Sequence, residues 1–310
     1  MKVAVTGATG VLGRAAVASA VGAGHEVRGL ARTAGEAQRL EAWGATPVCA
    51  DVVDRDSLVA AFDGCDAVCS LAPEAPVGAG VARGRAWRDH DRVRARAAVA
   101  VADAARAAGV RRLVQESTSL LYADHGEEWV TEQSLLDITA ATEPATVAEA
   151  HAQGFGAACR GGERSAVILR FGQVLGDDLA SLCMVRSARR GRPVGFGRPE
   201  GWAHVVHTDD LGGAVLAALR APAGIYNVGA QPVRRAEIAA AVGAAIERPA
   251  PELHGPLRTR LAGSRAESWG RSLRVSSDEV EVRTGWSPMR PVLGADWFEV
   301  PCTGPSALVR

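Results

Sequence analysis

Apolar and polar positions follow two different rhythms along the first half of the chain. Short, nearly continuous apolar runs are typical of buried strands, whereas apolar positions three and four residues apart indicate helices. The apolar runs predict strands at 3–5, 26–30, 46–49, 66–71, 111–115 and 165–169. The spaced positions predict helices at 11–21, 34–43, 57–62, 91–108 and 143–159.

Strands and helices that alternate in this order predict a parallel sheet covered by helices on both faces. The pattern becomes mixed after the sixth strand, where short apolar runs interleave with Pro and Gly. One helix in this part is expected to begin with Asp209 or Asp210 as its N-cap. We therefore predict a Rossmann-like, doubly wound α/β domain over 1–172, to which 203–230 can return, and a smaller mixed lobe over 173–310.

A glycine-rich loop, TGATGVLG, joins the first predicted strand to the first predicted helix. Its first glycine permits a tight turn, the second lets the backbone approach a pyrophosphate, and the third lets helix and strand pack closely. The free N–H groups and positive partial charge of the helix N-terminus favour phosphate. The first domain is therefore expected to bind a dinucleotide through Gly7, Thr9, Gly10, Val11, Leu12 and Gly13.

The end of the second predicted strand indicates which dinucleotide is bound. An acidic residue there would bind the ribose hydroxyls of NAD, but Ala31 occupies that position and Arg32 follows it. A guanidinium group can bind a 2′-phosphate through charge-assisted hydrogen bonds. NADP is therefore the favoured cofactor and NAD the less favoured one, the alternative being that Arg32 is a solvated surface charge.

Composition narrows the remaining possibilities. The 310 residues carry a formal net charge of zero, which gives no electrostatic argument for nucleic acid or an anionic membrane. Apolar runs are too short for the roughly 20 residues of a membrane-spanning helix, and the N-terminus enters a strand pattern at once. We expect a cytoplasmic protein with a small-molecule substrate, no metal site, and reduced thiols at Cys49, Cys65, Cys69, Cys159, Cys183 and Cys302. A homodimer stays open.

Several short motifs follow the predicted strands, and two further motifs mark the second lobe. They are the glycine loop, Asp51-Val52, Leu71-Ala72, Ser117 to Tyr122, Arg170 to Gly176, His207 to Asp210, and Gly285 to Pro288. With these motifs the chain resembles the extended short-chain dehydrogenase/reductases, the NAD-dependent epimerase/dehydratase group. The resemblance implies that the cofactor lies across the carboxyl ends of the strands and the substrate between the two lobes.

The resemblance also implies roles for individual residues. Asp51 and Val52 would meet the adenine, and Leu71 and Ala72 would line the path of the ribose and diphosphate. Ser117 would adjoin the cofactor. Two further residues would face the chemistry: Thr118 matches the Ser/Thr that hydrogen-bonds the reacting oxygen, and Gln173 matches a polar position near the nicotinamide.

The chain departs from this family at its catalytic tyrosine and lysine. With Glu149 matched to the glutamate that follows the family motif, Ala141 stands at the tyrosine position and Ala145 at the lysine position. A shifted alignment does not restore the pair, because the chain has two tyrosines, neither followed by lysine, and Lys2 as its only lysine. A positioned general acid is worth about 10²–10⁴-fold in rate, so carbonyl chemistry here would need another proton donor.

Substitute donors can be sought near Thr118. Tyr122 is the phenol closest in sequence, and His125 has the side chain best suited to acid–base work near neutral pH. Each has a simpler interpretation, Tyr122 as a packed loop aromatic and His125 as an exposed loop histidine. In the second lobe, His204, preceded by Trp202, is a further candidate to face the substrate.

Three functions remain open on these observations. The first is an NADP-dependent oxidoreductase acting on a small or polyketide-like carbonyl or alcohol through a substituted proton relay. The second is a non-redox lyase, isomerase or cyclase on the same fold. The third is an NADP-binding sensor without turnover. The glycine loop and Thr118 favour the first, and the missing tyrosine and lysine motivate the other two.

Overall fold

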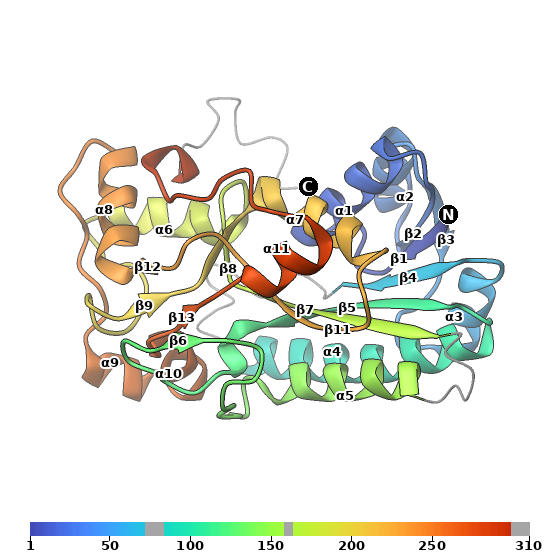
Figure 1. The fold of residues 1–310 in the computed structure, drawn as a ribbon. Coiled ribbons are helices and arrows are strands. Elements are labelled where there is room, and N and C mark those ends of the chain that lie inside the picture. Colours follow the sequence, from blue (N-terminus) through green and yellow to red (C-terminus); the bar gives the residue numbers. More distant parts are fainter. Residues whose placement is uncertain (72–83, 158–163, 299–310) are drawn as a thin grey trace.

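A seven-stranded parallel sheet forms the centre of the protein (Figure 1). The computed structural model describes residues 1–71, 84–157 and 164–298. The strand order is β11-β7-β5-β4-β1-β2-β3, and every neighbouring pair is parallel. The strands are β1 (Lys2–Val5), β2 (Glu26–Ala31), β3 (Thr46–Cys49), β4 (Ala67–Ser70), β5 (Arg112–Thr118), β7 (Ser165–Phe171) and β11 (Gly224–Val228).

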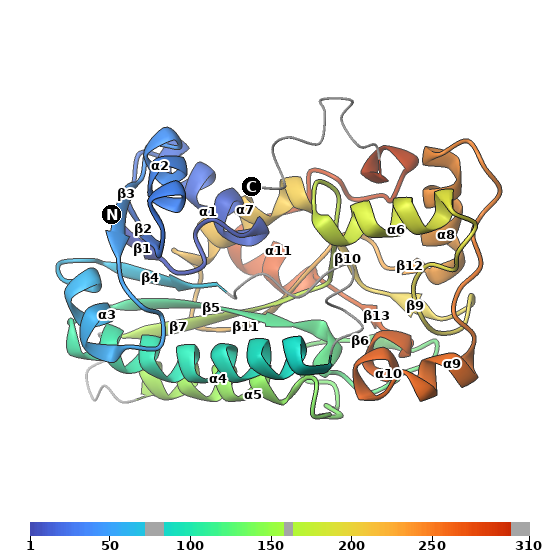
Figure 2. The same ribbon diagram turned by 180° about the vertical axis from the view of Figure 1, so that it is seen from behind.

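Helices cover both faces of this sheet, each over its own hydrophobic core (Figures 1 and 2). One face carries α1 (Val11–Gly22), α2 (Ala34–Ala42) and α7 (Thr208–Ala218). The other carries α3 (Arg55–Phe62), α4 (Gly84–Ala107) and α5 (Glu143–Ala157). The predicted Rossmann-like, doubly wound fold is confirmed.

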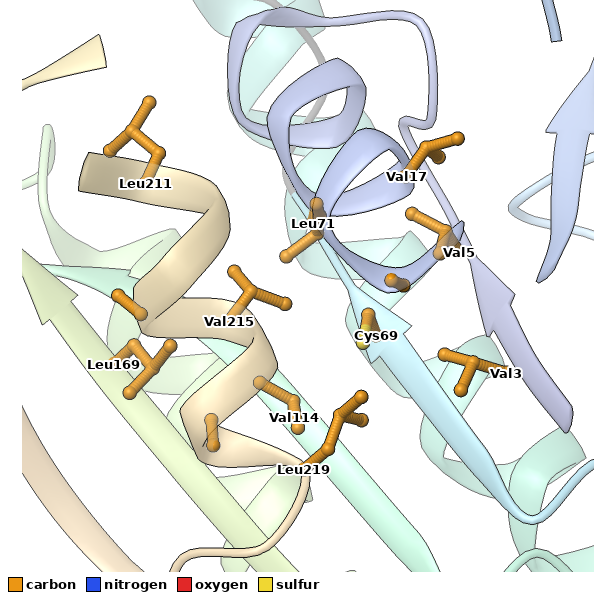
Figure 3. Close-up of a cluster of buried hydrophobic side chains, with 14 of the residues drawn as sticks. Val3, Val5, Val17, Cys69, Leu71, Val114, Leu169, Leu211, Val215 and Leu219 are labelled. Atoms are coloured by element: carbon orange, nitrogen blue, oxygen red, sulfur yellow. The ribbon is translucent and has the colours of Figure 1, made fainter. Parts of the chain in front are cut away.

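Helices α1 and α7 lie side by side over the sheet, with Val17 on one and Leu211, Val215 and Leu219 on the other (Figure 3). Their approach is close because α7 carries a glycine at the contact. A Cβ atom at Gly212 would overlap atoms of α1. The phosphate-loop helix is thus packed directly against a helix that comes from the second half of the chain.

The second lobe is built from short elements around a separate core. Small two-stranded sheets form within it, and β13 pairs with β6. Its strands are β6 (Trp129–Val130), β8 (Gln173–Leu175), β9 (Trp202–Ala203), β10 (Val205–His207), β12 (Val233–Arg234) and β13 (Arg274–Val275). Its helices are η2 (Ser119–Leu121), α6 (Leu179–Arg189), α8 (Arg235–Ala245), α9 (Pro256–Leu261), α10 (Ser264–Gly270) and η3 (Ala295–Phe298). Helix α11 (Asp278–Thr284) instead packs against β11, and its Val280 belongs to the core under α1 and α7.

Two local expectations differ from the structure. Helix α4 begins at Gly84 rather than residue 91, because Ala and Arg favour helix even without an apolar stripe. Helix α7 is capped by His207, whose Nδ1 accepts a hydrogen bond from the Asp209 amide at 3.1 Å, and not by an aspartate. Asp210 instead accepts from the backbone N–H of Met289 at 2.6 Å. Within the described residues, no helix combines the length and apolar character needed to cross a membrane.

Candidate functional site

The loop between β1 and α1 turns sharply at Gly7, whose φ of 60° lies in the left-handed region that favours glycine. The Gly10 amide donates to the Gly7 carbonyl at 3.0 Å and closes the turn. The Thr6 hydroxyl donates to the carbonyl of Leu71 at 3.2 Å, and the Leu71 amide donates to the Thr6 hydroxyl oxygen at 3.1 Å. The ends of two neighbouring strands are thereby fixed next to the start of α1.

The other two glycines of the loop meet the requirements of a phosphate cradle in different ways. A Cβ atom at Gly10 would meet only the Gly7 carbonyl oxygen, at an ordinary contact distance of 3.4 Å, and the space beyond it is open. A Cβ atom at Gly13 would overlap the backbone of Gly7 and Ala8. The loop therefore leaves room above Gly10 and packs tightly under Gly13, and it fits a dinucleotide pyrophosphate.

A first cavity, of about 230 Å³, extends from this loop across the carboxyl ends of the strands. At its outer end, Arg32 and Arg39 contribute to its wall together with Glu36. Glu36 is held by the Arg32 amide at 2.6 Å, so its charge is occupied with capping α2. The expected cofactor residues that line this cavity are Gly7, Thr9, Gly10, Arg32, Val52 and Leu71.

The described lining of this cavity does not include every expected cofactor residue. Asp51 is absent from the described lining, and its Oδ1 accepts a hydrogen bond from the Val53 amide at 3.1 Å. Ala72 lies outside the residues that the structure describes.

A second cavity, of about 320 Å³, lies between the sheet domain and the second lobe. Both cavities are lined by Arg94 and Glu116, so they adjoin at these two side chains. The expected residues in the second cavity come from four separate stretches of the chain: Val11, Leu12, Thr118, Gln173 and His204. A third hollow, of about 620 Å³, involves none of the expected cofactor or substrate residues.

Thr118 ends β5 at the wall of the second cavity. Its Oγ1 accepts a hydrogen bond from the Leu120 amide at 3.2 Å, which leaves the hydroxyl proton able to donate. Ser117 points the other way because successive side chains of a strand face opposite sides. It is fully buried, and its hydroxyl donates to Glu149 at 2.6 Å.

Glu149 belongs to a buried ionic network behind the sheet. Its carboxylate pairs with Arg170 through two hydrogen bonds of 2.8 and 2.7 Å. Arg170 also donates to the Tyr122 hydroxyl at 3.0 Å, and that hydroxyl donates to Asn227 at 2.7 Å. Tyr122 is wholly buried, and burial raises the pKa of its phenol. The structure thus assigns Tyr122 to packing and leaves it outside the described cavity walls.

His125 and Trp202 also lie outside both cavities. The His125 ring is hydrogen-bonded through Nδ1 to the Ala123 carbonyl at 2.8 Å. The Trp202 ring lies under the guanidinium of Arg234 at 3.8 Å, and its Nε1 donates to Glu127 at 3.0 Å. Both residues take part in the surface of the second lobe, where neither can reach a ligand in the second cavity without a rearrangement.

His204, by contrast, lines the second cavity in a buried position. Its Nε2 lies 3.5 Å from the Ser277 hydroxyl, and no described residue is a partner of its Nδ1. Burial lowers the pKa of His204 to about 3, so its imidazole is neutral near pH 7. A neutral imidazole can hold a substrate by a hydrogen bond, but it carries no extra proton to donate.

An ion pair between Glu116 and Arg94 was missed from the sequence. One Arg94 nitrogen lies 2.9 and 2.8 Å from the two Glu116 oxygens, at the point where the cavities adjoin. Burial raises the pKa of the Glu116 carboxyl, and the Arg94 cation opposes that shift. The signal in the sequence was a glutamate inside an otherwise buried strand, where a charge requires a partner or a role.

Further side chains of α4 and α10 complete this wall. Trp87, His90 and Arg265 all line the second cavity. The Arg265 guanidinium lies 3.8 Å above the Trp87 ring and 2.6 Å from Asp91. These residues are far apart in sequence, and no local motif joins them.

The structure also locates Ala141 and Ala145, which stand at the positions of the family's catalytic tyrosine and lysine. Ala141 lines the second cavity, and Ala145 is buried behind it. No phenol or amine from the described residues takes the place of Ala141 in the cavity wall. The site therefore offers hydrogen-bond donors and a buried carboxyl group, without the usual proton donor.

A parallel sheet with a glycine loop under a cavity that leads into an inter-lobe cleft defines a dinucleotide-binding protein of the Rossmann class. The chain belongs to the NAD dependent epimerase/dehydratase family, whose model matches residues 3–229.

Among characterised relatives, a 3-diazoavenalumate denitrifying reductase from Streptomyces sp. is 28% identical over 94% of this chain and 97% of its own. A 2-alkyl-3-oxoalkanoate reductase from Shewanella oneidensis is 34% identical over 42% of this chain and 32% of its own. Reductases therefore occur among the relatives, and the first of them matches both lobes.

Solved structures agree with the fold. A human epimerase family protein with NADPH has a TM-score of 0.78 at 25% identity, over 96% of this chain and 98% of its own. The UDP-glucose 4-epimerase of Thermus thermophilus with NAD has a TM-score of 0.75 at 24% identity, over 96% and 97%. A nicotinamide dinucleotide is thus supported as the cofactor.

Proposed function

We propose that the protein is an NADPH-dependent reductase that replaces the diazo group of a small aromatic diazonium compound with hydrogen. The observation that carries this proposal is Ala141 in the wall of the second cavity, at the position of the family's proton donor. The full-length relative named as a denitrifying reductase of a diazo compound supports it.

The proton balance of this reaction fits a site that lacks the usual proton donor. Reducing a carbonyl requires a hydride at carbon and a proton at oxygen, and the proton donor is worth about 10²–10⁴-fold in rate. An aryl diazonium ion requires no proton. Bound NADPH would supply a hydride. The ring carbon would accept this hydride with its electron pair, while the C–N bond breaks and N₂ leaves with the bonding pair. The aryl diazonium cation and NADPH would thus give the arene, N₂ and NADP⁺, so that charge and atoms balance.

The residues of this chain have defined tasks in such a reaction. Thr118 and Gln173 line the cavity wall and present a hydroxyl and an amide that can position polar substituents of the substrate. The Arg94–Glu116 pair separates the two cavities, and its paired charges keep that wall polar without a net charge. The walls from both lobes limit water, which would otherwise attack the diazonium carbon.

A second candidate is reduction of a ketone with Glu116 as the proton donor. Its support is the position of the Glu116 carboxyl between the two cavities, where burial raises its pKa. The relative named as a 2-alkyl-3-oxoalkanoate reductase supports it over the 42% of the chain that it matches. This candidate replaces Tyr122 and His125 as donors, because neither lines a described cavity.

One experiment separates the two reactions. The protein is mixed with NADPH deuterated at the nicotinamide C4 and with either diazotised 4-aminocinnamate or a panel of 3-oxoalkanoates. The proposal expects NADPH consumption, N₂ release and cinnamate deuterated on the ring. The Glu116→Gln variant should keep this activity, whereas ketone reduction that uses Glu116 should fall about 10²–10⁴-fold. A folded variant unable to bind NADPH measures the uncatalysed rate.

Consumption of NADPH with ketones and none with the diazonium compound would reject the first candidate in favour of the second. Binding of NADPH with no consumption on either panel would leave a sensor. Change of a substrate without net consumption of cofactor would indicate non-redox chemistry.

The preference for NADPH rests on Arg32 and Arg39 at the outer end of the first cavity. The Arg32 side chain is 75% exposed, and its ion pair with Glu36 is long, at 3.6 Å. The guanidinium can therefore turn toward a 2′-phosphate. Arg32→Asp should weaken NADPH binding by about 1.5–3 kcal/mol, the scale of a hydrogen bond to a charged group, and leave NADH unchanged. Calorimetric titration measures both.

Arg55→Asp is the matched control, because Arg55 is an exposed arginine outside the cavity and the change in net charge is the same. Its affinity for NADPH should equal that of the parent. Equal affinity of the parent for NADPH and NADH would contradict the role of Arg32.

A further inference from the structure

The second cavity contains three arginines from the described residues, and two of them are neutralised. Arg94 pairs with Glu116, and Arg265 pairs with Asp91 at 2.6 Å. Arg235 has no carboxylate partner among the described residues. Among the described residues of the second cavity wall, Arg235 is therefore the arginine whose charge no carboxylate compensates.

Arg235 is also deeply buried. The residue is 6% exposed, although arginine is rarely buried without a partner. Its Nη2 donates to two backbone carbonyls, those of Trp269 at 2.9 Å and of Arg271. Its Nη1 packs against Gly201 and has no hydrogen-bond partner in the described chain. Such an orphaned donor requires an explanation, and a ligand absent from the structure is one.

The electrostatic surroundings do not supply a counter-charge. Burial lowers the pKa of Arg235 to about 10, and the field of Asp124 opposes that shift without a direct contact. The guanidinium therefore stays charged at neutral pH. A buried charge that lacks a partner is destabilising, and an anion placed beside it would offset that effect.

The side chains next to Arg235 limit what this anion can be. Trp269, Leu273 and Ala203 line the same cavity and present apolar surface. One uncompensated guanidinium in the wall matches a single negative charge, such as that of a carboxylate. A phosphate group would bring more charge than this wall compensates.

Resting on the proposed function, we propose that Arg235 binds a carboxylate of the substrate on the second-lobe wall, so that the substrate is an unsaturated or aromatic carboxylic acid. The side chain acts in binding and takes no part in bond making. The reacting ring then lies toward Thr118, on the wall formed by the sheet domain.

The test uses binding without turnover. The parent protein, saturated with NADPH, is titrated calorimetrically with trans-cinnamate and with trans-cinnamamide, its neutral counterpart. Cinnamate should bind at least about tenfold more tightly, the effect of one hydrogen bond to a charged group. Arg235→Met should remove this preference and leave cinnamamide affinity unchanged. Arg235→Lys keeps the charge and should retain the preference.

Arg234→Met is the matched control. Arg234 is the preceding residue, pairs with Glu127 at 2.7 Å and is not part of the cavity wall, so the cinnamate preference should survive its loss. If Arg235→Met does not fold, the parent and Arg235→Lys decide the matter. Equal binding of the two probes by the parent would overturn the proposal, as would displacement of cinnamate by inorganic phosphate at a similar concentration. A retained preference without turnover of any diazonium compound would reject only the proposed function.

Discussion

Gly10→Val is expected to fold like the parent and to lose measurable NADPH binding. Gly10 has φ −74° and ψ 177°, an extended conformation that valine adopts without strain. Its Cβ would meet one backbone oxygen at 3.4 Å, and the branched side chain would extend into the first cavity. Pyrophosphate and valine cannot share that space. Calorimetric titration measures the binding, and thermal unfolding measures the fold.

Gly13→Ala provides the contrast. Here a Cβ would overlap the backbone of Gly7 and Ala8, so the loop itself must move. We expect this smaller substitution to lower the melting temperature as well as to weaken binding. If Gly10→Val binds NADPH as the parent does, the glycine loop is not the pyrophosphate site.

The largest loss of stability is expected from Glu149→Leu. The substitution leaves Arg170, whose side chain is 3% exposed, without its counter-charge. Breaking a buried pair on one side costs about 3–5 kcal/mol, a large part of the roughly 5–15 kcal/mol that holds a typical protein folded. Urea unfolding followed by circular dichroism measures the change in the free energy of unfolding.

The paired variant tests the cause. Glu149→Leu combined with Arg170→Met removes both charges and should regain most of the lost stability, because the two residues interact directly. Gln153→Leu is the control: it lies exposed on the same helix and should change stability by less than about 0.5 kcal/mol. A single variant as stable as the parent would show that Arg170 finds another partner or water.

The sheet and the glycine loop could be predicted because their signals are local. The apolar run from Val3 to Val5, the Gly-rich turn after it and the spaced apolar positions of the next helix are all visible within about 20 residues. The boundary of α4 was missed because the segment after Gly84 is charged. The cap of α7 was assigned to an aspartate by propensity, although the residue that caps the helix is His207, two positions before Asp209.

The chemical site was less predictable, for a different reason. Tyr122 and His125 follow Thr118 closely in sequence, but a chain that turns after β5 carries them away from the cavity, and Arg170 and Asn227 take the Tyr122 hydroxyl. Conversely, Arg94 and Glu116 form an ion pair although they are 22 residues apart in the sequence. Contacts of this kind depend on how a helix packs on a strand, which no short motif records.

The route of the chain between the lobes bears on how this protein could be re-engineered. The polypeptide leaves the sheet after β5, returns for α5 and β7, leaves again at β8, returns for α7 and β11, and leaves once more at β12. A chimera that takes its substrate lobe from a relative would therefore need several matched junctions. Some of these junctions would lie beside a residue of the second cavity, such as Thr118 or Gln173. Substrate range is thus better altered by point substitutions in the cavity wall than by exchanging a contiguous segment.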